Sequence, residues 1–144
     1  MNSVSNTLVE NNNELNLLLS EASRYVSEAA RTGIGAHDVE KQVFDYVPKM
    51  GRQMMSSFFQ LQGDGALGDT LMLPEGKRVK RLEMRTRTYR SLLGDFKISR
   101  YGYGVRDKQA VVCYPLDTRL QLPEDEHSYP VHKCKNLTNQ KIAL

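Results

Sequence analysis

A seven-residue stretch, GDGALGD at residues 63–69, separates two segments with different hydrophobic patterns. It contains three glycines and two aspartates, which favour turns and end helices. Before it, apolar residues recur at spacings of three and four, the period of an amphipathic helix. After it, apolar, aromatic and β-branched residues are interleaved with cations, which is typical of strands. We therefore expect a helical part followed by a β-rich part, an α+β fold.

The first predicted helix begins near Leu15. Its apolar face includes Leu15, Leu18, Ala22, Tyr25 and Ala29, and the stripe is widened by Leu17, Leu19, Val26 and Ala30. Thr-Gly-Ile-Gly ends the helix, because Gly33 suits the position just after a helix. Residues 1–13 are polar and rich in asparagine, so we expect them to form a disordered end.

A second helix is predicted after Ala36, and the two helices should form an antiparallel hairpin. Its apolar stripe includes Val39, Val43, Met50, Met54, Phe58 and Leu61. Pro48 lies inside it and predicts a kink or a short break, because proline removes one backbone hydrogen bond. Methionine and phenylalanine at helical spacing favour a core, but a surplus apolar face is also compatible with dimerisation or a partner domain.

The β-rich part carries a marked charge asymmetry. Residues 77–108 contain eleven basic and three acidic residues, whereas residues 1–76 contain five basic and ten acidic ones. A localised basic block is the footprint expected for a polyanion partner. It also fits a solvated sheet face that pairs with the acidic N-terminal part. The residues that would contact DNA phosphates are Lys77, Arg78, Lys80, Arg81, Arg85, Arg87, Arg90, Lys97, Arg100 and Arg106.

A hairpin is predicted within this block. Gly94-Asp95 suits a two-residue turn, which would pair Leu93 with Phe96 and Ser91 with Ile98. Arginine and lysine on such a ribbon can cover apolar surface with their stems while the charged heads stay in water. Tyr101 and Tyr103 would then either close the sheet or pack against nucleic-acid sugars.

The C-terminal third has weaker patterns. Residues 110–114 form a short apolar run, and the Pro-Leu-Asp-Thr that follows suggests a turn into a short helix or an extended arm. The predicted organisation is therefore a disordered N-terminus (1–13), a helical hairpin (14–62), a basic β-rich segment (68–129) and a poorly ordered tail (130–144).

Several classes of protein are disfavoured. No apolar run is long enough for a transmembrane helix, and no secretory signal is visible, so we expect a cytoplasmic protein without a membrane partner. Cys113 and Cys134 are expected to be free thiols. With His127 and His132 they match no standard zinc spacing, and no nucleophile or phosphate-binding motif is present. We therefore predict no metal, no cofactor and no catalytic residue.

A family resemblance is carried by residues 68–129. An arginine-rich strand leads into TYRSLLGDFKISRYGY, and after a spacer comes YPLDTRLQLP. The most specific parts are Leu93-Gly94, Arg100-Tyr101 and Pro115-Leu116-Asp117. This region resembles the N-terminal region of ISKra-type insertion-sequence transposases of the DDE class, and Met50-Gly51-Arg52 resembles the family's Leu-Gly-Arg helix. Members often carry cysteine pairs before Pro-Leu-Asp, where this chain has Cys113 alone.

The resemblance implies a DNA-binding fragment that lacks the RNase H-like nuclease core, so that no residue here receives a catalytic role from the family. It also implies a truncated or frameshifted chain with an aberrant tail. The predicted function is binding to the ends of an insertion sequence, with self-association as a further expectation. The alternative is a small protein-interaction or dimerisation module that works through its helical hairpin.

Overall fold

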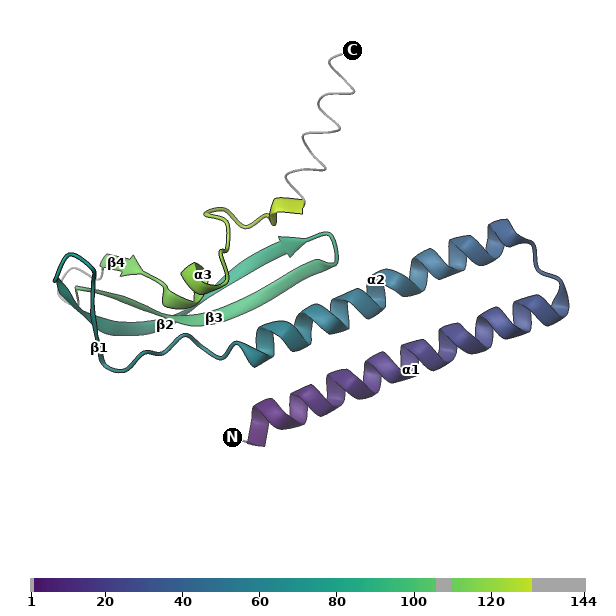
Figure 1. Ribbon diagram of the computed structural model, residues 1–144, viewed down its shortest axis with the longest axis horizontal. Coiled ribbons are helices and arrows are strands. Elements are labelled where there is room, and N and C mark those ends of the chain that lie inside the picture. The colour runs from purple at the N-terminus through teal and green to yellow at the C-terminus, as the bar shows by residue number, and fades with distance from the viewer. Residues whose placement is uncertain (1, 106–109, 131–144) are drawn as a thin grey trace, which may run out of the picture. The chain divides into compact units, whose positions relative to one another are not determined.

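The computed structural model describes residues 2–105 and 110–130, and it confirms the predicted α+β fold (Figure 1). Two helices come first, and a four-stranded antiparallel sheet follows. The chain forms two compact units, Met1–Leu61 and Gln62–Leu144, which we call the helical unit and the sheet unit. None of the described helices is long and apolar enough to span a bilayer. The predicted tail over 130–144 lies outside the described residues, apart from residue 130.

The helical unit consists of α1 (Asn2–Thr32) and α2 (Ala36–Leu61). The predicted end of the first helix is confirmed: Gly33 has a φ of +76°, and the N–H groups of Gly33 and Ile34 both donate to the Ala29 carbonyl at 3.0 Å. Ala29 is fully buried, but no residue of α2 is buried. The helices also meet at Tyr25 and Tyr46, whose ring centroids are 6.4 Å apart. This unit therefore has very little core of its own.

Residues 2–13, for which the sequence predicted disorder, form the first turns of α1, which begins at Asn2. α2 runs to Leu61 and gives the first turns of α1 a helix to lie against. Asn11 Nδ2 donates to Gln60 Oε1 at 2.9 Å, so the asparagine-rich sequence takes part in the helix pair. A segment whose composition disfavours helix formation can be stabilised as a helix by tertiary contacts of this kind.

Of the kink or short break predicted at Pro48, the break is not observed, since α2 is continuous through this residue. Pro48 and Phe44 both lie on the exposed surface of α2. The Phe44 carbonyl, which loses its hydrogen-bond donor to the proline ring, can therefore be solvated by water. The helix tolerates the missing bond because it falls on the solvent side.

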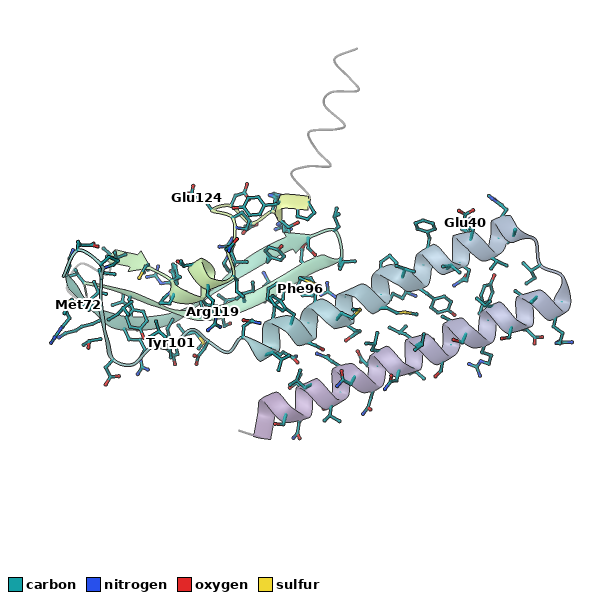
Figure 2. The ribbon with its side chains drawn as sticks, in the orientation of Figure 1. Glu40, Met72, Phe96, Tyr101, Arg119 and Glu124 are labelled. Atoms are coloured by element: carbon teal, nitrogen blue, oxygen red, sulfur yellow. The ribbon has the colours of Figure 1, made fainter. Side chains whose placement is uncertain are left out.

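The sheet unit contains β1 (Thr70–Met72), β2 (Arg78–Ser91), β3 (Gly94–Val105), β4 (Ala110–Cys113) and the short helix α3 (Pro115–Arg119). The strand order is β1-β2-β3-β4, and all neighbours are antiparallel. Its buried apolar side chains are Val79, Phe96, Ile98, Tyr103 and Leu116. Phe96 is labelled in Figure 2. Pro-Leu-Asp-Thr begins α3, so the predicted short helix is confirmed and the alternative, an extended arm, is not observed.

The β2–β3 hairpin exists, but its predicted register is wrong. Ser91 pairs with Gly94 and Tyr89 pairs with Phe96, so that Leu92 and Leu93 form the turn. Ser91 Oγ donates to the Gly94 carbonyl at 2.8 Å and accepts the N–H of Leu93 at 3.1 Å, which fixes this turn. Gly94 has a φ of +108°, and glycine suits the position after a turn as well as the first position within it.

Tyr103 closes the sheet. Its side chain is completely buried, and its hydroxyl donates to the Gly68 carbonyl at 2.6 Å and accepts the Leu67 N–H at 2.8 Å. The loop that contains GDGALGD is thereby fixed against β3. Of the two roles considered for this tyrosine, packing is the one observed.

Candidate nucleic-acid interface

The ten predicted DNA-contacting residues divide into two groups in the structure. Arg106 lies outside the described residues. Among the other nine, four form ion pairs with carboxylates of the sheet unit, namely Arg81, Arg87, Arg90 and Arg100. The five that form no ion pair with a described residue are exposed, namely Lys77, Arg78, Lys80, Arg85 and Lys97.

Asp117 on α3 joins two of the paired arginines. Arg100 donates from Nε to Asp117 Oδ1 at 2.8 Å and from Nη2 to Oδ2 at 3.0 Å, and Arg87 Nη1 donates to Oδ2 at 3.1 Å. The exposed fraction of the side chain is 7% for Arg100, 14% for Arg87 and 17% for Asp117. The Arg100 guanidinium also lies 3.7 Å from the ring centroid of Tyr114. These cations hold α3 on the sheet and are not presented to an external partner.

A second set of contacts fixes the segment that follows α3. Arg87 Nη2 donates to the carbonyls of Pro123 and Asp125 at 2.9 and 2.6 Å. The backbone of Arg90 bonds to Glu126 and Ser128, through N–H···O distances of 2.6 and 2.8 Å. We call residues 120–128 the C-terminal arm. It is bound along β2 by the same arginines that the sequence suggested for DNA.

The Arg90 side chain also forms ion pairs within the sheet unit. Its Nε lies 2.9 Å from a Glu126 oxygen and its Nη1 lies 3.0 Å from an Asp95 oxygen. The hydrogen bond from Arg90 lowers the pKa of the Glu126 carboxyl, and the same bond raises the pKa of Arg90. Both groups are exposed, so this pair is open to screening by salt.

Arg87, Arg90 and Arg100 therefore differ from the sequence-based expectation, because internal carboxylates and carbonyls occupy their guanidinium groups. The partners lie far along the chain, and Asp117 is 30 residues from Arg87. Composition counts acids and bases, but it does not reveal which of them meet in the fold. The sequence feature that could have indicated α3 is Pro115-Leu116-Asp117, because a proline followed by an acidic residue suits the first turn of a helix.

Two of the three motifs singled out in the sequence contribute to this network, Arg100-Tyr101 through Arg100 and Pro115-Leu116-Asp117 through Asp117. Pro115 starts α3, Leu116 is 1% exposed, and Asp117 accepts from Arg100. Gly94 follows the hairpin turn with a positive φ. In this chain, Arg100 and Asp117 thus fix a short helix to a β-hairpin.

Lys77, Arg78, Lys80 and Arg85 lie at the other end of β2, together with Arg81, whereas Lys97 lies on β3 and donates to Thr88 Oγ1 at 2.6 Å. The ladder with β3 is irregular between Arg81 and Met84, where β2 has a β-bulge. A hollow of about 680 Å³ lies there, lined by Asp69, Thr70, Lys80, Arg81, Leu82, Glu83, Arg85 and Tyr101. Bulges twist a strand and redirect its side chains, which brings cations and an aromatic ring to one surface.

Arg81 and Tyr101 shape this hollow. The Arg81 guanidinium carbon is 5.0 Å from the centroid of the Tyr101 ring, which is labelled in Figure 2. Arg81 also pairs with Asp69 at 3.2 Å, but the Asp69 side chain is 91% exposed. An ion pair in that setting is weak and leaves the guanidinium available to a stronger anion.

The net charge also differs between the start of β2 and the rest of the described sheet unit. Residues 69–85 contain five basic and three acidic residues. The described residues between 87 and 126 contain five of each. The positive excess of the described sheet unit therefore lies at the start of β2, and we call Lys77, Arg78, Lys80, Arg81 and Arg85 the β2 cation cluster.

Metal ligation is not indicated by the described residues. Within residues 2–105 and 110–130, no three histidine, cysteine, aspartate or glutamate side chains are grouped so as to hold an ion. Cys113 is half-buried, and burial raises the pKa of its thiol. His132 and Cys134 lie outside the described residues.

Comparison with known proteins gives no relative: no family model, no curated protein and no solved structure matches the chain. The transposase resemblance therefore stays a prediction from sequence.

Proposed function

We propose that the chain binds duplex DNA through the β2 cation cluster, as the DNA-binding part of an insertion-sequence transposase located in the cytoplasm. The observation that supports this proposal is that the basic residues fall into two groups with different surroundings. Internal carboxylates engage the arginines beneath α3 and the C-terminal arm, whereas the cluster at the bulge keeps its positive excess beside Tyr101.

The chemistry of the cluster suits a phosphate backbone. Lysine and arginine side chains that neutralise phosphates release condensed counterions, and this release drives sequence-independent binding. A two-stranded antiparallel ribbon such as β2–β3 is narrow enough to enter a major groove. The Tyr101 ring would pack on a sugar or base next to the phosphates. The assignment to transposases rests on the sequence resemblance alone.

The test is DNA binding by two charge-matched double variants, measured by fluorescence anisotropy of a labelled duplex. Lys80→Glu with Arg85→Glu changes the cluster, and Lys41→Glu with Lys49→Glu changes the total charge equally on α2. We expect the first variant to weaken binding at least about tenfold, or about 1.4 kcal/mol, at low salt. The second should bind within about threefold of wild type.

Equal loss in both double variants would show that net charge, not the β2 cluster, governs binding, and would contradict the proposal. Unchanged binding by Lys80→Glu with Arg85→Glu would contradict it too. The alternative function, protein interaction through the helical hairpin, involves no residue of β2, so the two functions can be separated by mutation.

A further inference from the structure

The two helices of the helical unit leave an apolar face without a partner. At 3.6 residues per turn, Val43, Val47, Met54, Phe58 and Leu61 fall within an arc of about 60° on α2. They are 37–66% exposed. On α1, Leu19 and Val26 form the corresponding stripe and are 54% and 44% exposed.

Both stripes lie on the same side of the helix pair. Contacts such as Tyr25 with Tyr46 and Asn11 with Gln60 identify the sides on which the helices face each other. Around each helix axis, the apolar stripe lies about 90° from the side that faces the other helix. Viewed along the chain direction of each helix, this rotation has the same sense in both. Because the helices are antiparallel, equal rotations bring the stripes to one common surface. We call these seven residues the hairpin apolar face.

Charge is segregated to the opposite surface. The two helices contain twelve charged residues, and eleven of them fall within an arc of about 100° on the side away from the apolar stripes. The exception is Glu40, which projects from α2 in Figure 2. A hairpin that is charged on one side and nearly free of charge on the other has one surface made for water and one made for burial.

We infer that the hairpin apolar face binds the same face of a second copy of the chain, which forms an intermolecular four-helix bundle. This inference extends the alternative function and does not depend on DNA binding. Among the described side chains of the helical unit, Ala29 alone is an apolar residue buried to a core level, so the helices need an external surface to pack against.

A second hairpin fits this requirement in size and chemistry. The stripe on α2 runs over 18 residue steps, about 27 Å, and a two-fold copy supplies a stripe of the same length. Seven large apolar side chains that are about half exposed present on the order of 700 Å², close to the roughly 800 Å² per partner of a standard interface. With one carboxylate per face, few like charges meet across the two-fold axis.

The described sheet unit does not offer a comparable strip. Its exposed large apolar side chains are Leu67, Met72, Met84, Leu92, Val112 and Tyr129. They come from the loop before β1, from β1, β2 and β4, from the hairpin turn and from the segment after α3. Compared with the described part of the sheet unit, a second copy of the hairpin is therefore the better-matched surface for this face.

Sedimentation equilibrium of the full chain over a dilution series tests the inference. The monomer has a mass of 16.4 kDa, so we expect twice that mass at high concentration. A 16.4 kDa species at all concentrations up to about 100 µM would overturn the inference whatever the variants do.

Leu19→Glu and Leu17→Glu form a matched pair. Both are exposed leucines of α1, at 54% and 60%, but Leu17 lies about 160° around the helix from Leu19 and outside the apolar face. We expect Leu19→Glu to raise the concentration needed for dimers by about 100-fold, because it buries an unpaired carboxylate. Leu17→Glu should leave the dimer intact.

Equal dissociation of both variants would contradict the assignment of the face. A monomeric wild type whose melting temperature falls only with Leu19→Glu would show instead that the face is covered by the same chain. DNA binding by the variants is scored separately, so failure of this inference and failure of the DNA proposal are distinguishable.

Discussion

Replacement of Asp117 by alanine tests the role that the structure gives to the predicted DNA-contacting arginines. The change removes three hydrogen bonds from Arg87 and Arg100 and leaves two largely buried guanidinium groups without their carboxylate. Removing one partner of a buried ion pair typically costs about 3–5 kcal/mol.

The expected loss for this site is near the lower end of that range, about 3 kcal/mol, for two reasons. Asp117 is 17% exposed, so some solvent screening is retained. Arg87 and Arg100 also keep carbonyl acceptors at Pro123, Asp125 and Arg85. For a domain of this size, each kcal/mol shifts the melting temperature by about 4–8 °C, so the shift should be about 12–24 °C.

Thermal unfolding followed by near-ultraviolet circular dichroism measures the sheet unit, which holds five of the seven tyrosines in a chain without tryptophan. Asp95→Ala is the control, because Asp95 is 54% exposed and pairs with Arg90, itself 46% exposed. An exposed pair of this kind contributes about 0–1 kcal/mol. A loss below about 1 kcal/mol for Asp117→Ala, equal to that of Asp95→Ala, would refute the buried network.

Three further predictions concern the sheet unit. Tyr103→Phe should destabilise it by about 1–3 kcal/mol in urea unfolding, because the two hydrogen bonds of a buried hydroxyl are lost; an unchanged midpoint would contradict this. Gly104→Ala should loosen β4, since a Cβ there would lie 2.0 Å from the Ala110 carbonyl oxygen; equal amide-exchange protection would contradict this. The lowered pKa of Glu126 stabilises the fold above its ordinary value of 4.5, and this contribution is lost as the pH falls through the lowered value. Glu126→Gln should therefore show a smaller drop in urea midpoint between about pH 6 and pH 3 than wild type, and an equal drop would argue against the pair with Arg90.

Local sequence patterns were sufficient for the order of elements. The three- and four-residue spacings after Leu15, the glycine at position 33 and the GDGALGD stretch correctly predicted two helices and then strands. They missed the helix over residues 2–13, where Asn11 bonds to Gln60 near the distant end of α2, a contact that local propensity does not encode. Gly94 suited two turns, and Ser91 decided between them through side-chain hydrogen bonds.

The candidate site was less predictable than the fold. The density of basic residues in the sequence located the basic ribbon. Arg100 and Lys80 contribute equally to this density, although Arg100 is buried against Asp117 and Lys80 is exposed. The distinction depends on which carboxylates the fold brings near, over separations of 17 to 36 residues in the observed ion pairs of Arg87, Arg90 and Arg100 with Asp117 and Glu126.

The salt dependence of duplex binding tests the central claim most directly. The slope of log K against log salt is about −0.9 for each phosphate neutralised, so a cluster of five cations predicts a slope per protomer of up to about −4.5. Lys80→Ala and Arg85→Ala should each reduce its magnitude by about 0.9. A slope near zero, or one that these two substitutions leave unchanged, would contradict DNA binding by the β2 cation cluster.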